Sequence, residues 1–442
     1  MQKKSSRARR SPPCRRNDAP ALRLPRNWVP IGFGCLFAGA LGTPADAQDA
    51  LQSALSFDSI LQTQANAPAE SPPGQPHLGP VLLTLGASSG VSFNNNINLS
   101  QNNTQSDVIL NAGLNLGAVW PATLQSQLNF STLLGYDYYL YHPVNNYVNV
   151  APGSVLNWNF LLDEWTLTLY DQFSYTRNVS TVASVSNTTG IPLFDNTIGL
   201  RAQWQPEHWQ VQLGYSYNNN ISDAAAYDYL NSTSDYLFAQ GAWRFANATQ
   251  LGLEASTSIT QYTQKIQPDN TSYSLGPYLQ WQVTKAISNS LRGGWTYYSF
   301  DATPVQRAST LSSYYFGLDL THQLTQFVSQ TLSAQRSVSA GINSGSAYNE
   351  QLTVNYGVNW SAAPWLHLGL NLSYEKGQQP ANQFSFNNLE HYDRYGISPS
   401  ISYQITKQLS ASLIYSFWDK NSNISGNSYK QDALNLQLQY AF

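Results

Sequence analysis

The last ten residues of the chain, 433–442, read ALNLQLQYAF and alternate strictly between apolar and polar or small side chains. A period of two residues is that of a β-strand, whose successive side chains point to opposite faces. About ten residues is also the length that a tilted strand needs to cross a bilayer. A strand of a soluble sandwich would show the same local pattern, so the rest of the chain must distinguish the two. The apolar positions are Leu434, Leu436, Leu438, Tyr440 and Phe442.

The same alternation recurs on both sides of eight short turns that are spaced about 40 residues apart. A β-propeller has a similar period, but each blade packs four short strands into it, whereas two long segments fill it here. We therefore predict an all-β fold, a transmembrane antiparallel up-and-down β-barrel of about 18 strands, from 82–93 to 433–442, with 16 as the alternative count. The turns are 121–123, 163–164, 205–208, 246–249, 284–285, 324–326, 361–364 and 406–407.

Long polar segments separate the hairpins, for example 176–194, 218–234, 376–390 and 419–428. Short turns on one side and long loops on the other are typical of barrels in outer membranes, where the short turns are periplasmic. Tryptophans gather beside the short turns, and tyrosines gather at the opposite strand ends. Such rings favour the two membrane interfaces. The predicted tryptophan girdle is Trp120, Trp165, Trp204, Trp209, Trp243, Trp281, Trp360 and Trp365.

Composition agrees with a barrel rather than with a bundle of membrane helices. Charged residues are only 11% of the chain, against roughly 25% in soluble proteins. Mean hydropathy is -0.33, and no run of 18 apolar residues is present beyond the N-terminal region, which excludes a helical membrane protein. Barrel strands need only one apolar face, so low charge and modest hydropathy coexist in them.

These features resemble bacterial outer-membrane β-barrel proteins, whose last strand alternates in this way and ends in Phe. A looser resemblance, carried by 92–97 and 105–107, is to β-barrel porin families, some of them linked with exopolysaccharide export; Asn95 stands where those families have Asp. The resemblance implies a multi-pass barrel in the bacterial outer membrane, with Phe442 as its assembly signal. It also implies contacts with outer-membrane lipid, lipopolysaccharide and the barrel-assembly machinery.

The N-terminal region, residues 1–47, reads as a signal peptide. A long basic stretch precedes the apolar segment 28–41, and Ala45-Asp46-Ala47 forms a small-x-small cleavage site. Cys14 and Cys35 both lie in this region, so the mature chain is expected to lack thiols. Residues 48–79 are rich in Pro and are predicted to be a periplasmic linker or a small plug, followed by the barrel at 80–442.

Alternation also predicts which charged side chains face the lumen. Their mixed signs favour either pairing within a wet wall or a transverse field at a constriction, and no ring of one sign is present. Asp171 and Arg336 fall on the lipid face by parity, so we expect bulges there or a position at the outer interface. The predicted lumen charges are Arg201, Arg244, Glu254, Arg292, Asp319, Glu375 and Arg394.

No enzyme motif accompanies this pattern, because the six His are scattered and no two have metal-ligand spacing. We therefore expect neither catalysis nor a metal or other cofactor. Without residues 1–47 the chain keeps 13 basic and 23 acidic residues, a net charge of -10 that disfavours nucleic acid. The function predicted is a passive, porin-like pore for small polar solutes or glycans. The alternatives are a polysaccharide-export or secretion barrel, and a structural or adhesive barrel that acts through its loops.

Overall fold

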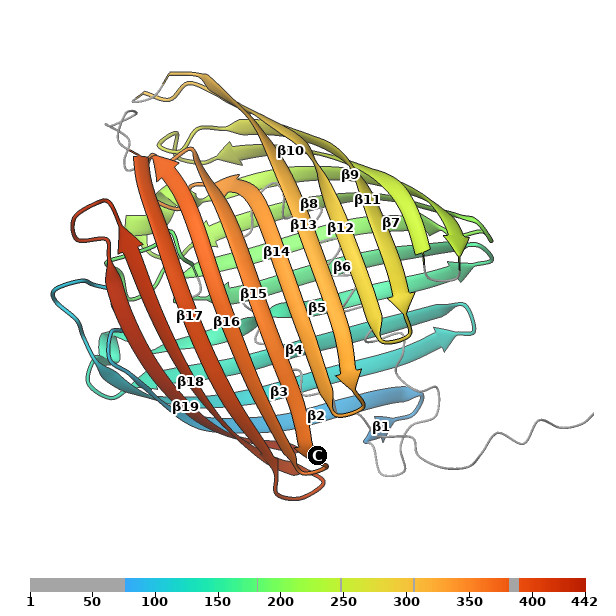
Figure 1. Cartoon of the computed structure of the whole chain (residues 1–442), viewed down its shortest axis with the longest axis horizontal. Helices are drawn as coiled ribbons and strands as arrows, with labels where there is room; N and C mark the ends of the chain where they lie inside the picture. The colour runs from blue at the N-terminus through green and yellow to red at the C-terminus, as the bar shows by residue number, and fades with distance from the viewer. Residues whose placement is uncertain (1–75, 181, 247–248, 305–306, 381–388) are drawn as a thin grey trace, which may run out of the picture. The chain divides into compact units, whose positions relative to one another are not determined.

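The computed structural model describes residues 76–442 except 181, 247–248, 305–306 and 381–388 (Figure 1). The predicted signal peptide, and all but the end of the predicted linker, lie outside the described residues. No helix in the part of the chain that is described has the length and apolarity needed to span a membrane.

Eighteen antiparallel strands, β2 to β19, form a closed ring in which each strand pairs with its sequence neighbours (Figure 1). The ring closes between the last strand and the first, with Leu434 opposite Phe93 and Ala441 opposite Gly86. The predicted transmembrane up-and-down barrel is therefore confirmed, with 18 strands rather than 16. Closed barrels are the form in which β-structure crosses bilayers, because closure satisfies the backbone groups of the first and last strands.

The strands run further into the loop end than the sequence suggests, and two short 3-10 helices lie in the loops. A two-residue strand, β1, precedes the ring and folds back on the start of β2. The elements are β1 (His77–Leu78), β2 (Val81–Asn94), β3 (Asp107–Thr123), β4 (Ser126–Tyr139), η1 (Pro143–Asn145), β5 (Tyr147–Leu162), β6 (Trp165–Thr176), β7 (Leu193–Trp204), β8 (Trp209–Ser222), η2 (Ala225–Leu230), β9 (Ser232–Ala246), β10 (Thr249–Tyr262), β11 (Asn270–Thr284), β12 (Ile287–Phe300), β13 (Ser309–Thr325), β14 (Val328–Ala340), β15 (Tyr348–Ala363), β16 (Leu366–Pro380), β17 (Leu389–Gln404), β18 (Leu409–Ser422) and β19 (Tyr429–Ala441).

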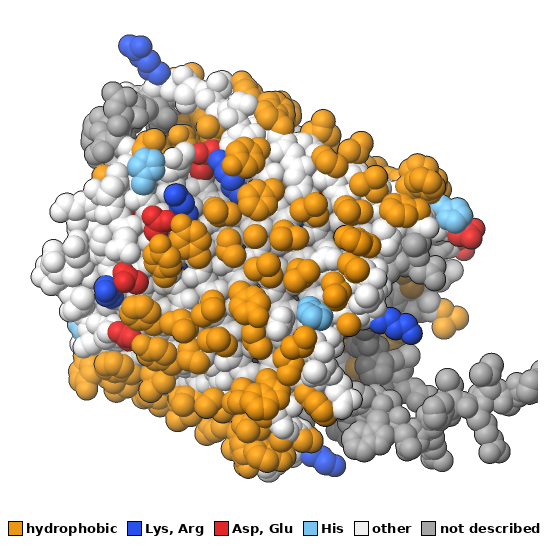
Figure 2. Space-filling model, viewed as in Figure 1, with side chains coloured by type: hydrophobic (Ala, Val, Ile, Leu, Met, Phe, Trp, Pro, Cys, Tyr) orange, Lys and Arg blue, Asp and Glu red, His pale blue; other side chains and the backbone are white. Residues whose placement is uncertain are grey.

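The alternation read from the sequence separates an apolar outer face from a polar inner face. Along β19, Leu434, Leu436 and Leu438 are exposed on the outside, whereas Gln431 is buried inside. Apolar side chains are spread across the outer surface in the view of Figure 2, and charged side chains gather toward the loop end. An exposed apolar band around a closed barrel is the surface that lipid covers.

Aromatic rings on the inner face lie flat against the wall, over glycines of the neighbouring strand. A Cβ added to Gly377 would meet the Tyr392 ring at 2.2 Å, and one added to Gly396 would meet Trp418 at 2.4 Å. Only glycine leaves room for such rings at these positions. Glycine inside these strands therefore allows large rings to be stored in the wall without projecting far into the lumen.

The predicted tryptophan girdle lies beside the short turns. Trp165 and Trp204 stack with ring centroids 6.1 Å apart, and the Trp204 indole donates a hydrogen bond to Glu164 at the adjacent turn. At the loop end, outward tyrosine hydroxyls donate to carboxylates, as from Tyr215 to Asp235 at 2.6 Å. That these rings mark the membrane interfaces stays a prediction.

The two charges that fit the alternation badly are both outward by parity. The described pairing of β6 with β7 is regular through Asp171, which lies opposite Ile198. Ile198 in turn lies opposite Tyr217 of β8. No bulge therefore turns Asp171 inward. Asn196 on the next strand donates to Asp171. Of the two explanations offered for Asp171, a bulge is therefore wrong, and a position at the outer interface stays a prediction. Arg336 lies where β13 and β14 separate and is treated below.

Deleting Phe442 should impair assembly of the barrel in the outer membrane. The Phe442 amide donates to the Leu85 carbonyl of β2 at 3.0 Å, and its ring lies 4.9 Å from that of Tyr440, so the residue helps to seal the closing strand pair. The test compares surface levels of the truncated chain with those of Phe442→Tyr, which keeps the ring and the amide. Normal levels of the truncated chain would contradict the prediction.

Candidate functional site

The seven charges predicted to face the lumen are all on the inner face by parity, but they form separate groups rather than a ring. Arg394 holds Glu375 with two hydrogen bonds of 2.8 and 2.9 Å. Glu254 lies 3.9 Å from Arg292 and accepts a hydrogen bond from the Tyr315 hydroxyl. Charges paired within the wall contribute little field to the lumen, since each guanidinium is offset by a carboxylate.

The remaining three belong to neither pair, although Asp319 of β13 lies close enough to Arg292 of the neighbouring β12 to interact with its charge. Arg201 is buried in the wall of β7. Arg244 donates to Gln210 at 3.3 Å, and both line a cavity together with Asp319. The sequence therefore placed these residues on the correct face, but it could not tell which of them meet.

A second buried ion pair was not predicted from the sequence. Lys420 lies 3.2 Å from Glu390, and both side chains are almost fully buried. Both residues fall in segments that were predicted to be loops, 419–428 and 376–390. The polar composition of these segments is like that of loops, so the ends of β17 and β18 within them were not recognised. With Arg394 and Glu375 they form what we call the docking cluster, on the inner face of β16, β17 and β18.

The docking cluster holds a loop that crosses the lumen. This inner loop, residues 177–192, connects β6 to β7, and β16 lies opposite β7 in the ring of eighteen strands. Arg394 donates to the Ser180 carbonyl at 2.7 Å, and Lys420 donates to the Ser186 hydroxyl at 2.9 Å. Gln379 of β16 donates to the Ser184 carbonyl at 2.9 Å. The docking cluster and Gln379 together therefore fix the inner loop to the far wall by side chains of three strands.

The inner loop also carries an apolar cluster into the loop-side mouth. Four of its side chains pack with Leu99 of the β2–β3 loop and with Tyr429 of β19, and Tyr227, Leu230 and Ile342 pack against them. Side chains from several loops thus pack together, and we call this set of residues the mouth cluster. Apolar contacts exclude water, so the mouth is narrowed by packing rather than by a ring of charge. The inner-loop members are Val179, Val182, Val185 and Ile191.

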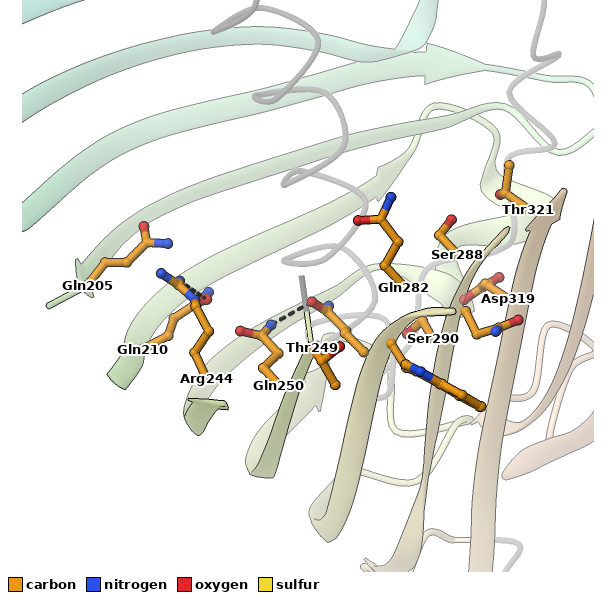
Figure 3. A pocket seen from close by; sticks show the side chains of 13 residues that line it. Gln205, Gln210, Arg244, Thr249, Gln250, Gln282, Ser288, Ser290, Asp319 and Thr321 are labelled. Atoms are coloured by element: carbon orange, nitrogen blue, oxygen red, sulfur yellow. Dashed lines mark hydrogen bonds between the residues drawn. The ribbon is translucent and has the colours of Figure 1, made fainter. Parts of the chain in front are cut away.

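The short-turn end is different, because a polar cavity of about 680 Å³ opens there along the wall of β8 to β13 (Figure 3). Gln210 accepts from Arg244, and Gln250 donates to Gln280 across neighbouring strands. Amides and hydroxyls both donate and accept hydrogen bonds, so this basin can exchange them with uncharged polar solutes. The basin is lined by Gln205, Gln210, Arg244, Thr249, Gln250, Gln280, Trp281, Gln282, Ser288, Asn289, Ser290, Asp319 and Thr321.

Among the described residues, no group of three or more His, Cys, Asp or Glu is arranged to hold a metal ion. The chemistry that the described lumen offers is therefore hydrogen bonding and charge, through amides, hydroxyls and a few ionised groups. Such a wall can select solutes by size and polarity without a chemical step.

No protein-family model matches the sequence. No curated protein is significantly similar to it in sequence. Solved structures that it resembles include Pseudomonas aeruginosa OccK2 (OpdF), with 12% identity over 84% of this chain and 99% of that one and a TM-score of 0.48. OccK2 in complex with glucuronate gives 10% identity over 83% of this chain and 100% of that one, with a TM-score of 0.48. OpdK of the same organism, with vanillate, gives 11% identity over 81% of this chain and 99% of that one, with a TM-score of 0.46. At these values the likeness assigns neither a family nor a ligand.

Arg394→Ala should destabilise the barrel by about 3–5 kcal/mol, because it leaves the buried Glu375 carboxylate without its counter-charge. It should also free the inner loop, which loses the bond to Ser180. Urea unfolding measures the first effect, and protease cleavage within the loop measures the second. The double variant Arg394→Met with Glu375→Leu should recover most of the stability, but not the protection of the loop. A single variant as stable as the parent would contradict burial of the pair.

Proposed function

We propose that this chain forms a water-filled pore for small polar solutes in the bacterial outer membrane, narrowed at the loop end by the inner loop. The observation that carries the proposal is a closed wall, apolar outside and polar inside, that is crossed by one loop fixed to the opposite side. Barrels of 16 to 18 strands are wide enough to leave an aqueous channel. The inner loop and the mouth cluster then set the narrowest section.

The proposal extends to the kind of solute. Two opposite charges, Arg244 and Asp319, are separated in the basin by a wall of amides and hydroxyls. Solutes that are rich in hydroxyl groups can replace their water hydrogen bonds with bonds to such a wall. Strong preference for one sign of ion is not expected, because the described basin contains one cation and one anion.

Excision of residues 178–190 tests whether the inner loop constricts the pore. The Ile191 amide already donates to the Arg177 carbonyl at 3.0 Å, so a two-glycine turn can join these ends without moving β6 or β7. The shortened chain should conduct more current in planar bilayers and should pass larger sugars than the parent. A matched control removes residues 102–104, which are exposed in the β2–β3 loop, and should leave both values unchanged. Unchanged conductance after excision would contradict a constriction at the inner loop.

The two charges of the basin should shift ion selectivity in opposite directions. Arg244→Gln removes the cation and should move the reversal potential in a KCl gradient toward cation preference, whereas Asp319→Asn should move it toward anion preference. Lys430→Gln is the control, because Lys430 is exposed outside the barrel beside Asp419. Equal reversal potentials for all three variants would show that ions do not pass the basin.

Export of surface polysaccharide is the second candidate, and the mouth cluster favours it. A mouth narrowed by apolar packing suits a route that opens on demand better than one that is open at rest. A strain without this protein would then lose surface polysaccharide while its uptake of small solutes stays normal. Loss of uptake with normal surface polysaccharide would support the pore instead.

A further inference from the structure

β13 and β14 pair at the short-turn end of the barrel and separate at the loop end. Pairing runs from Thr325 opposite Val328 to Phe316 opposite Arg336. Beyond that point β13 continues to Ser309 in pairing with β12, and β14 continues to Ala340 in pairing with β15. Figure 1 shows the two strands side by side at the short-turn end and apart near the loops. We call residues 337–349, the end of the β14–β15 hairpin, the hairpin tip.

The hairpin tip is folded inward behind β12 and β13. Val338 has the parity of the outward residues of β14, yet it is fully buried in a cluster with Tyr298 and Phe300, which are inward residues of β12. Glu350, which is outward by the parity of β15, accepts a hydrogen bond from Ser313 on the inner face of β13 at 2.7 Å. The outer side of the hairpin thus faces the inner side of the neighbouring wall.

Side chains hold the hairpin tip by its backbone carbonyls. The Tyr298 hydroxyl donates to the Val338 carbonyl at 2.9 Å, and Gln267 donates to the Gly341 and Asn343 carbonyls at 2.7 and 3.0 Å. Tyr229 of η2 donates to the Ile342 carbonyl at 3.0 Å. Burial raises the pKa of Tyr229 to about 12, which further favours the protonated hydroxyl that donates this bond. The hairpin tip is therefore anchored by polar bonds, while Ile342 packs against the mouth cluster.

Arg336 lies where the two strands part. Its guanidinium donates to the Ser313 hydroxyl at 3.0 Å, to the Tyr314 carbonyl, and to Glu350 at 3.1 Å. It also lies 4.0 Å from the centre of the Tyr314 ring. The side chain thus bridges from β14 to β13 at the end of the backbone register. This explains the charge that fitted the alternation badly, since Arg336 closes the end of the zipped segment.

The sequence of the hairpin tip also fits a second position. Continuing the register of Phe316 with Arg336 sets Tyr314 opposite Val338, and Ser313 opposite Ser339. In that register Val338 points outward beside Tyr314, and Ser337 and Ser339 point inward. This is the apolar-out, polar-in pattern of residues 331–335 of β14. The same residues therefore encode both an inward fold and a continuation of the wall, and a bistable element of this kind is what a gate requires.

We propose that the hairpin tip is the gate of this pore: it closes the mouth in the inward position, and it opens the mouth by zipping onto β13. Opening exchanges the carbonyl anchors and the Glu350 contacts for backbone pairs between β13 and β14. It also withdraws Ile342 from the mouth cluster, which loosens the packing around the inner loop. The inference rests on the proposed pore, because a gate presupposes a passage.

A disulfide can lock the outward position. Opposite residues of an antiparallel pair are about 4.5–5.5 Å apart at Cα, within the range that a disulfide spans. Ser313→Cys with Ser339→Cys, in a chain that also carries Cys14→Ser and Cys35→Ser, should cross-link under mild oxidant only when the hairpin tip zips onto β13. A minor state typically holds about 0.1–10% of molecules, so the locked form should pass sugars at least about tenfold faster than the reduced form.

Control variants distinguish the effect of locking the hairpin tip from the effects of a disulfide or a cysteine substitution in itself. Ser402→Cys with Ser412→Cys cross-links two residues that are already opposite each other on β17 and β18, and it should leave flux unchanged. Each single cysteine reports the effect of losing Ser313 or Ser339 alone. Gln267→Ala, which removes two carbonyl anchors, should speed formation of the 313–339 disulfide in the full chain.

Two results would overturn the gate. The first is failure of the 313–339 disulfide to form while the 402–412 disulfide forms in full. The second is a 313–339 disulfide that forms and leaves flux unchanged. Failure of the proposed pore is recognised separately, because the chain lacking residues 178–190 would then also pass no sugar, whereas cross-linking still reports whether the outward register is reached.

Discussion

Backbone hydrogen bonding in a medium without water is the constraint on which the rest of this structure depends. A strand in hydrocarbon must pair on both edges, so the chain closes into a ring in which β19 meets β2. Closure then fixes the two-residue alternation, because each side chain faces either lipid or the lumen. The polar lumen, the apolar exterior and the order of the strands all follow from this requirement.

The fold was predictable because alternation and turn spacing are local signals. Residues 433–442 already carry the pattern of β19, and the short turns gave the strand count. Gly377 and Gly396 were not understood from the sequence, since their need for space comes from rings on the next strand. The ends of β17 and β18 were missed because their composition is as polar as that of loops.

The site was less predictable because it depends on contacts between distant segments. Parity placed Arg394 and Glu375 on the inner face, but it could not show that Arg394 also reaches Ser180 of a loop from the opposite wall. Lys420 and Glu390 were not recognised at all. Arg336 was noticed as an exception to the pattern, and that exception marked the place where the wall divides. A break in a regular pattern was thus the most informative signal for function.

The proposed pore requires that polar solutes cross the barrel and that the loop-side mouth limits their size. The most direct measurement is swelling of liposomes that contain the purified, folded chain, with sugars of increasing size as the osmotic solute. We expect swelling with monosaccharides and a steady fall in rate as the sugars lengthen. Swelling no faster than that of protein-free liposomes, for every sugar, would contradict it.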